Sequence, residues 1–418
     1  MPFAVTAIVL LALFGLPLFA VLGAGSLLYA HHSDLNSALL IVELNRLAAS
    51  PNLIAIPLFT LAGVILSSGG APQRLIRMFN ALLGWMPGGL SIVAITACAF
   101  FTSFSGASGV TILALGGLLY PVLRKVQYPE PFSLGLLTTS GSLGLLFPPS
   151  LAILLYGVVA GVNIDDLFLA GVVPGLVLML ILWIYAAAVG TRFDIPRHIF
   201  SWTILRRALR TGFGDLMLPV LIVVGIFGGY VTVSEAAACT ALYVLLLESV
   251  IHRSISLRRQ LVPLLADTAV LVGSILIILG IAMGLTNLLI DAQLPMQLLE
   301  WMQNSIDTRL KFLLLLNLFL LAVGAMMDIF SATVVVVPLI LPLAQRFGVD
   351  PVHLGVIFLA NLEIGYSTPP VGINLFIASQ RFEKPVLTLF RSTLPFLALM
   401  LVWLGIVTYL PALSLWWR

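Results

Sequence analysis

Four short polar segments interrupt the apolar sequence of this 418-residue chain, and they form two similar pairs. They cover residues 102–109 and 141–150 in the first half, and 324–331 and 363–370 in the second. Each pair ends in a double proline, which removes two backbone donors and clashes with the preceding helical turn. The freed carbonyl and hydroxyl oxygens can replace the hydration shell of a hard cation, and half-helix N-termini can face an anion. The pairs therefore predict a site for a cation and an anionic solute; plain proline kinks are the alternative.

Single polar residues inside apolar sequence extend this prediction. Asp328 is the acid most deeply placed in such sequence, and an acid there is costly unless it has a role. We expect it to take part in cation binding, with a structural hydrogen bond to the hairpin backbone as the alternative. Glu363 either couples protons or reaches the membrane interface, and Asn374 either contacts substrate or makes an interhelical hydrogen bond. Thr232 to Glu235 has the pattern of a capping box, so we expect Glu235 to be structural.

The composition indicates a polytopic membrane protein. Hydrophobic residues make up 61% of the chain and charged residues 9%, and uncharged stretches leave room for roughly ten or more spans of about 20 residues. Gly-Lys occurs nowhere, so a Walker A loop is excluded, and uphill transport would use an ion gradient or another subunit. Cys98 and Cys239 lie alone and are interpreted as core packing. The histidines do not cluster at ligand spacing, and no cofactor or nucleic-acid partner is expected.

The positions of basic residues and prolines predict orientation and an internal repeat. The basic loops 192–210 and 253–259 are expected in the cytoplasm by the positive-inside rule. A shift of 221 residues aligns the two halves, so that prolines 121, 148, 149 and 174 fall on prolines 342, 369, 370 and 395. Counting membrane crossings in both directions from these two cytoplasmic loops places the halves in opposite orientations. The basic residues then expected on the periplasmic side are Arg46, Arg309, Lys311, Arg346 and Arg418.

The predicted fold is therefore an all-α polytopic membrane protein with two inverted repeats. Each repeat has a re-entrant helical hairpin and a broken helix, and inverted repeats of this kind are a signature of secondary transporters. The predicted division is an N-terminal scaffold helix and interfacial segment (1–52), repeat 1 (53–190), a basic loop with connecting helices (191–273) and repeat 2 (274–411). The hairpin tips are expected near 103–108 and 324–331, and the breaks near 144–150 and 365–370.

With these motifs the sequence resembles the large membrane subunit of tripartite ATP-independent periplasmic (TRAP) transporters, the DctM-like family, almost from end to end. The resemblance is carried by segments 56–63, 105–108, 156–161, 166–171, 229–237, 327–328 and 368–376. It implies an elevator-type fold of the ion-transporter superfamily. It also implies a Na⁺-coupled symporter in the bacterial cytoplasmic (inner) membrane that imports organic acids such as dicarboxylates. It also implies two partners, a small DctQ-like membrane subunit and a DctP-like periplasmic solute-binding protein that delivers the organic anion.

The resemblance also implies two Na⁺ sites, one at each hairpin tip. The first would use Ser103, Ser105 and Gly106 with the backbone near Gly144 and Phe147. The second would use Met327 and Asp328 with Gly365 and Thr368. Substrate contacts are expected from Ser108, Ser150 and Asn374. Glu363 departs from the family pattern, so coupling to Na⁺ or to H⁺ stays open.

Two other functions are compatible with parts of the sequence. Residues 106–109 fit the Gly-x-Ser-Gly motif of intramembrane serine proteases, but that chemistry needs a histidine base near Ser108, and no histidine lies at membrane depth in a later helix. A stand-alone Na⁺- or H⁺-coupled anion symporter is the nearer alternative. If a binding protein does deliver substrate, we expect it to dock on the periplasmic loops near 31–50, 291–311 and 346–353.

Overall fold

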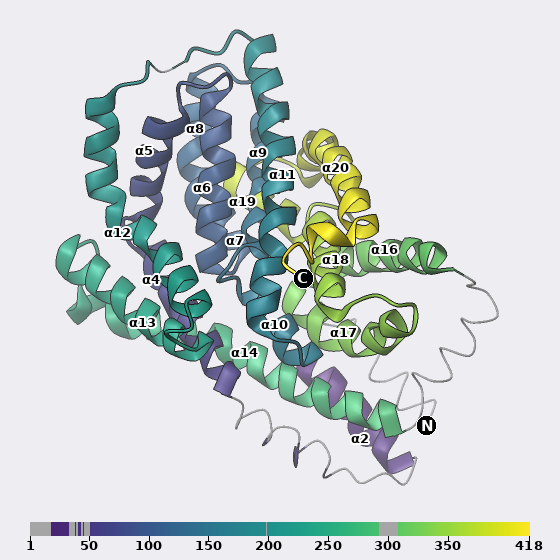
Figure 1. The fold of residues 1–418 in the computed structure, drawn as a ribbon. Helices are drawn as coiled ribbons and strands as arrows, with labels where there is room; N and C mark the ends of the chain where they lie inside the picture. The colour runs from purple at the N-terminus through teal and green to yellow at the C-terminus, as the bar shows by residue number, and fades with distance from the viewer. Residues whose placement is uncertain are drawn as a thin grey trace.

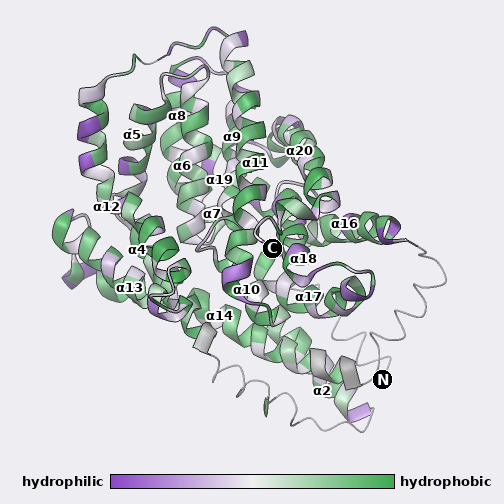
Figure 2. Ribbon diagram, in the orientation of Figure 1, coloured by the Kyte–Doolittle hydropathy of each residue, from purple (hydrophilic) through white to green (hydrophobic). Residues whose placement is uncertain are grey.

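The computed structural model describes residues 18–32, 38, 41, 42, 45, 51–197, 199–291 and 308–418. Within these residues the regular elements are all helical (Figure 1). Seven of the described helices are long and apolar enough to cross a membrane, or up to nine if each bent pair counts as one span. Hydrophobic residues cover most of their length, whereas polar residues gather toward helix ends and connections (Figure 2). Most of the predicted segment 1–52, including Arg46, lies outside the described residues.

The first half contains a hairpin followed by a broken helix and a closing helix. After α2 (Leu18–His32) and η1 (Pro51–Ile54), α4 (Ala55–Ser68) and α5 (Ala71–Leu83) meet at 75°. The hairpin consists of α6 (Gly89–Ser105) and a returning arm of α7 (Ser108–Thr111), η2 (Ile112–Gly116) and α8 (Gly117–Lys125). The broken helix consists of α9 (Glu130–Ser140), η3 (Leu143–Leu146) and α10 (Leu151–Ala160), and α11 (Ile164–Arg192) closes the unit.

The second half repeats this order after three connecting helices. These are α12 (Trp202–Phe227), α13 (Val233–Leu246), extended by η4 (Leu247–Ile251), and α14 (Leu257–Asp291). The second hairpin is α16 (Arg309–Met326) and α17 (Ile329–Arg346), the second broken helix is α18 (Pro351–Gly365) and α19 (Ile373–Phe382), and α20 (Val386–Tyr409) with η5 (Pro411–Leu413) ends the chain. The division predicted between residues 273 and 274 falls inside α14.

Two groups of ion pairs mark opposite faces of the molecule and show that the hairpins open in opposite directions. Lys384, between α19 and α20, pairs with Glu130 at the start of α9 at 2.7 Å. On the other face, Arg418 pairs with Asp166 at 2.9 Å and with Asp350 at 2.6 Å. The first hairpin leads into α9 on the Lys384 face, whereas the second leads into α18 on the Arg418 face. The two halves are therefore inverted relative to each other.

The halves pack on each other reciprocally. The second half of each broken helix contacts the returning arm of the other hairpin, since α10 packs on α17 and α19 packs on α7 and η2. Each closing helix likewise packs on the first half of the other broken helix, in the pairs α11–α18 and α20–α9. Helix α4 contacts α6, and α14 contacts α17, so α4 and α14 support one hairpin each. Reciprocal contacts of this kind are what a two-fold relation between equivalent units produces.

Two local predictions can be compared directly with the structure. The capping box is confirmed, because the Thr232 hydroxyl accepts from the Glu235 amide while the Glu235 carboxylate accepts from the Thr232 amide. Cys98 is buried as predicted, but the interpretation of Cys239 as core packing is wrong, because this residue is exposed on α13. A cysteine is small and apolar enough to face lipid as well as protein.

A buried charge network, which the sequence analysis did not predict, joins α5 to α12 and to η4, the extension of α13. The Arg74 guanidinium donates to both carboxylate oxygens of Asp215, at 2.7 and 2.8 Å, and also to the Glu248 carboxylate. Glu248 accepts further hydrogen bonds from the Gly70 amide and the Ser254 hydroxyl. All three charged side chains are buried, and a buried ion is tolerated only when its partners satisfy it. The network therefore fixes α5 against the connecting helices.

We predict that Glu248→Gln destabilises the protein strongly, because it leaves Arg74 buried with one carboxylate. Removing one partner of a buried pair typically costs about 3–5 kcal/mol. The melting temperature of the detergent-purified chain should fall by several degrees. Asp194→Asn removes an exposed carboxylate in the loop after α11 and should leave the melting temperature within about a degree. Equal effects of the two substitutions would contradict a structural role for the network.

Candidate ion and substrate site

The first hairpin tip presents carbonyl oxygens at the C-terminal end of α6. The helix ends at Gly106, whose φ of +65° is left-handed and whose amide donates to the Thr102 carbonyl at 2.8 Å. The last carbonyls of a helix lack intrahelical donors. Those of Ser103, Phe104 and Ser105 accept no hydrogen bond from any residue that the structure describes. These oxygens are suitable ligands for a hard cation.

The first break lies directly against this tip. A Cβ atom at Gly144 would collide with the backbone of Ala99 and Ser103, so only glycine allows the two segments to approach so closely. The Thr102 hydroxyl donates to the Gly141 carbonyl at 2.8 Å and lies 2.6 Å from the Thr111 hydroxyl. The structure thus brings Ser103 and Gly144 together, and Thr102 is a contact that the sequence analysis did not single out.

The other predicted residues of the first site are near the tip but differ in orientation. The Ser105 hydroxyl lies 3.5 Å from the Ala107 carbonyl and from the Thr111 hydroxyl, and Gly106 packs against Leu151. The Phe147 ring lies against Gly175 of α11, and its carbonyl accepts from the Ser150 amide at 3.0 Å. Phe147 therefore packs its side chain on the closing helix.

At the second tip, Asp328 caps helix α17. Its Oδ1 accepts from the amides of Phe330 and Ser331, both at 3.0 Å, and its Oδ2 accepts from the Ser331 hydroxyl. The structural hydrogen bond to the hairpin backbone, offered as the alternative, is therefore present. A carboxylate has about four acceptor positions, so cation contact remains chemically available and stays a prediction. The neighbouring carbonyls of Met326 and Met327 accept no hydrogen bond from a described residue.

The second break repeats the close approach of the first. A Cβ atom at Gly365 would collide with Gly324 and Ala325. The Ala325 carbonyl accepts from the amides of Val371 and Gly372, at 3.0 and 3.1 Å, just after the Pro369–Pro370 step. The Thr368 hydroxyl donates to the Ile364 carbonyl at 2.9 Å. Nothing in the residue type of Ala325 indicates this role, because its backbone oxygen performs it.

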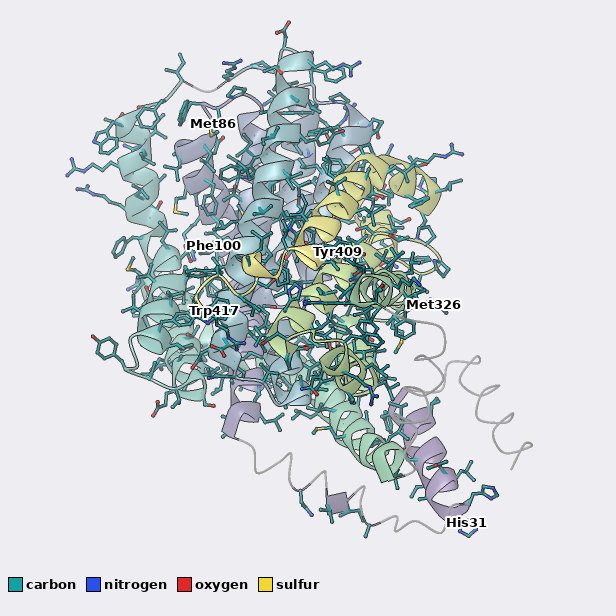
Figure 3. All side chains as sticks on the ribbon, turned by 45° about the vertical axis from the view of Figure 1, so that its right-hand side comes forward. His31, Met86, Phe100, Met326, Tyr409 and Trp417 are labelled. Atoms are coloured by element: carbon teal, nitrogen blue, oxygen red, sulfur yellow. The ribbon has the colours of Figure 1, made fainter. Side chains whose placement is uncertain are left out.

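The Pro148–Pro149 and Pro369–Pro370 bonds of the two breaks are both cis. The two hairpin tips, in contrast, differ in how far other residues cover them. The first tip is enclosed, since Gly63 of α4 touches the Phe104 carbonyl. At the second tip, the Met326 side chain is 63% exposed and points away from the body of the molecule (Figure 3). The first tip is therefore held against α4 while part of the second is uncovered.

Helix C-terminal ends converge at both sites. The end of α6 meets the end of the α9–η3 segment at Ser103 and Gly144, and the end of α16 meets the end of α18 at Gly324 and Gly365. Each helix C-terminus carries roughly half a negative charge. Two such ends with free carbonyls favour a cation. The geometry therefore produces two corresponding environments with the electrostatic character that suits a cation, while cation binding itself stays a prediction.

Helix N-terminal ends meet between these environments. Helix α7 begins at Ser108 and α19 begins beside Asn374, and the Ser108 hydroxyl donates to the Asn374 amide oxygen at 2.7 Å. The Asn374 amide nitrogen donates to the Thr138 carbonyl at 3.5 Å. Ser108 and Asn374 are both buried, so this contact closes the region. The third predicted substrate residue, Ser150, instead caps α10 by accepting from the Ala152 amide at 3.2 Å.

Two further sequence hypotheses have an outcome here. Glu363 has 0% exposure and neither carboxylate oxygen has a partner among the described residues. The expectation that it reaches the interface is therefore wrong, and proton coupling stays a prediction. The protease hypothesis lacks its base, because the hydroxyl of Ser108 donates to Asn374, whereas the one deeply buried histidine described, His353, contacts the Thr408 carbonyl.

This arrangement of inverted hairpins, broken helices and apolar spans defines a multi-pass membrane transporter. A family model described as the DctM component of the tripartite ATP-independent periplasmic transporter matches residues 5–413. The chain belongs to this family of large TRAP permease subunits, as the sequence resemblance predicted. It is accordingly a transporter and not an enzyme, and its location is the bacterial inner membrane.

Individual relatives agree with this assignment. The chain is 34% identical to the C4-dicarboxylate TRAP transporter large permease protein of Vibrio cholerae, over 96% of this chain and 94% of that protein. It is 34% identical to an isethionate TRAP transporter permease protein, DctMQ, of Oleidesulfovibrio alaskensis, over 87% of this chain and 57% of that protein. Other relatives have names that refer to ectoine and sialic acid.

The fold is also similar to a solved structure. The YdaH transporter of Alcanivorax borkumensis has a TM-score of 0.63 and 16% sequence identity, covering 90% of this chain and 88% of that one. At this identity the likeness concerns the fold alone. It supports the architecture of the two halves and carries no information about the solute.

We predict that Gly365→Ala disrupts the second break, because the added methyl group would enter the backbone of Gly324. Overpacking typically costs about 1–3 kcal/mol, which should lower the melting temperature by several degrees and abolish most transport. Gly405→Ala is the matched control, since a Cβ there meets nothing within 4 Å. A Gly365→Ala protein as stable and active as the control would show that the close approach is not required.

Proposed function

We propose that this subunit imports a small organic anion, driven by a Na⁺ gradient, with the solute delivered by a periplasmic binding protein. The observation that supports the proposal best is the pair of converging helix C-termini at Ser103–Gly144 and Gly324–Gly365, beside the carbonyls of 103–105 and 326–327 that accept no hydrogen bond from a described residue. The N-terminal ends of α7 and α19 lie between the two, where a negatively charged group is favoured. Two cation sites flanking one anion site are suited to coupled transport.

The proposed cycle uses the Na⁺ ions as cargo. Two bound cations would offset the partial negative charge of the helix ends and would be coordinated by the tip carbonyl oxygens that lack a hydrogen-bond donor. The Ser108–Asn374 hydrogen bond would open to admit the solute, whose acidic group replaces it. Movement of both hairpins against α4 and α14 would then carry solute and ions across, in an elevator-type mechanism. Gly63, which touches the first tip, and the α14–α17 contact provide the surfaces for this movement.

The proposed partners follow from the family and from the names of relatives. A tripartite transporter has two further components, which we propose to be a small DctQ-like membrane subunit and a DctP-like binding protein. The isethionate relative, named DctMQ, supports the first of these. C4-dicarboxylates and isethionate are organic anions, so we propose a carboxylate or similar acid as the solute. Of the three proposed docking loops, the structure describes only 346–353, at the Arg418 face, in full.

Asp328→Asn tests the second Na⁺ site. Asparagine caps a helix as well as aspartate does, so α17 should remain intact while the negative charge is lost. We expect the Na⁺ concentration for half-maximal uptake to rise at least about tenfold, because a close charge–charge contact contributes more than one kcal/mol at intermediate dielectric. The measurement is initial uptake by proteoliposomes that contain both membrane subunits, with binding protein and labelled solute outside.

Asp194→Asn is the control, since it also removes one carboxylate charge but lies exposed in the loop after α11, away from both hairpin tips and from the proposed docking loops. Its Na⁺ dependence should equal that of the unaltered protein. Unchanged Na⁺ dependence in Asp328→Asn would remove Asp328 from the site. Uptake that needs no binding protein would overturn the tripartite part of the proposal, and uptake driven equally by a proton gradient without Na⁺ would overturn the choice of ion.

Ser108→Ala tests the solute site. The substitution removes the hydroxyl that donates to Asn374, and a lost hydrogen bond to a charged solute typically costs about 1.5–3 kcal/mol. The apparent affinity for solute should fall about tenfold or more, while the half-maximal Na⁺ concentration changes little. Ser150→Ala, which removes only the cap of α10, is the comparison. Equal loss of solute affinity in both variants would contradict a direct contact at Ser108.

A further inference from the structure

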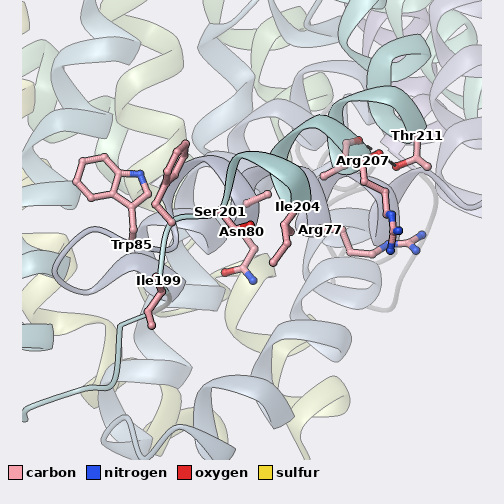
Figure 4. Close-up of a pocket in the computed structure, with 11 residues that line it drawn as sticks. Arg77, Asn80, Trp85, Ile199, Ser201, Ile204, Arg207 and Thr211 are labelled. Carbon is pink, nitrogen blue, oxygen red and sulfur yellow. Dashed lines mark hydrogen bonds between the residues drawn. The ribbon is translucent and has the colours of Figure 1, made fainter.

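A basic pocket lies far from the hairpin tips, between α5 and the start of α12. It has a volume of about 300 Å³, and the polar side chains that line it come from both helices (Figure 4). Arg77 and Asn80 belong to α5, whereas Ser201, Arg207 and Thr211 belong to α12 or the residue before it. Because the loop 192–210 is among the most basic in the chain, the positive-inside rule places this pocket at the cytoplasmic surface of the membrane.

The charge of this pocket is uncompensated within the described residues. Arg77 and Arg207 line it together, and its lining contains no acidic residue. Arg77 donates only to the Gln73 carbonyl, in its own helix, and neither arginine has an ion pair among the described residues. Two acids on the neighbouring segments, Asp215 of α12 and Glu248 of η4, are both held by Arg74. Two like charges that line one cavity are stabilised by an anion between them.

The rim of the pocket is apolar and suited to lipid. Trp85 and Phe200 stack edge to face across it with ring centroids 6.5 Å apart, and Phe200 also contacts Trp202. Ile199 is 93% exposed and Trp202 69% exposed. Exposed tryptophans and isoleucines beside arginines are typical of the level at which lipid head groups meet acyl chains. A soluble anion would gain nothing from this rim.

A second cavity continues the first. It has a volume of about 500 Å³ and shares Arg77 and Thr211 with the first pocket, and its lining also includes Gln73, His252 and Ser254. Together the cavities form a polar path from the aromatic rim to the buried Arg74 network. A polar head group that extends beyond one phosphate would therefore have donors available on both sides of Arg77.

We propose that this pocket binds the phosphodiester head group of an anionic phospholipid, with Arg77 and Arg207 on the phosphate and the acyl chains along Trp85 and Ile199. Basic pockets at the cytoplasmic surface are suited to such head groups. The bound lipid would fasten the surface helix α5 to α12, next to the Arg74 network that fixes the other side of α5. This site is separate from the proposed transport site and does not depend on it.

The test measures lipid binding and stability with the full chain in neutral detergent. Phosphatidylglycerol should raise the melting temperature and remain bound in native mass spectrometry, whereas phosphatidylcholine and inorganic phosphate should do neither. Each of Arg77→Gln and Arg207→Gln should weaken phosphatidylglycerol binding about fivefold, as expected for loss of one basic residue near an anionic membrane lipid. The double variant should lose the stabilisation.

Arg206→Gln and Arg210→Gln provide the matched control. Both arginines are exposed on α12, carry the same charge and do not line the pocket, so their double variant should bind phosphatidylglycerol as the unaltered chain does. Equal loss in the control would show a diffuse surface effect and overturn the site. Stabilisation by inorganic phosphate alone would identify a free-anion site, and stabilisation by phosphatidylcholine would show that charge is not recognised; either result would overturn the proposal.

Discussion

Every backbone amide and carbonyl inside a bilayer must find a partner within the protein, and the two Pro-Pro steps make this requirement acute. A continuous helix satisfies itself, but a broken one leaves polar groups free at the depth where water is scarce. In the second repeat the Ala325 carbonyl receives the amides of Val371 and Gly372. In the first repeat the Thr102 hydroxyl reaches the Gly141 carbonyl. Each hairpin therefore supplies hydrogen-bond partners that its broken helix lacks, so the two elements depend on each other inside the bilayer.

This mutual completion is only partial, and the remainder is where chemistry becomes available. The hairpin tips supply donors and acceptors to the breaks but keep several of their own carbonyls free, while glycines at 144 and 365 allow the two helix ends to approach within contact of each other's backbone. A larger residue would separate the two helix ends and weaken the negative electrostatic potential that they produce together. The same glycines that relieve steric conflict thus concentrate partial negative charge. Close packing and the proposed preference for a cation therefore share one structural cause.

The sequence allowed most of the architecture to be predicted, because prolines and glycines report directly on backbone geometry. The helix breaks at the doubled prolines, the positions of the hairpin tips and the opposite orientations of the two halves were all predicted from residue spacing and charge. The Glu235 cap was predictable because its pattern is local. The Arg74 network was not, since Arg74 is more than a hundred residues away in the sequence from both Asp215 and Glu248 and meets them only after folding. The role of Ala325 was invisible for a different reason, because a backbone oxygen leaves no trace in residue type. Cys239 and Glu363 show that apolar neighbours in sequence do not determine which way a side chain faces.

The exchange of contacts between the halves has a consequence for the origin of the chain. Because α10 needs α17 and α19 needs α7 and η2, one repeat without the other would leave apolar and polar surfaces uncovered. An ancestral protein made of a single unit could have reached this arrangement only by pairing with an upside-down copy of itself, and so by inserting into the membrane both ways. Fusion through the arginine-rich connection around 192–210 would have fixed the orientation of each copy, since the positive charge keeps this connection in the cytoplasm. The two copies could then diverge.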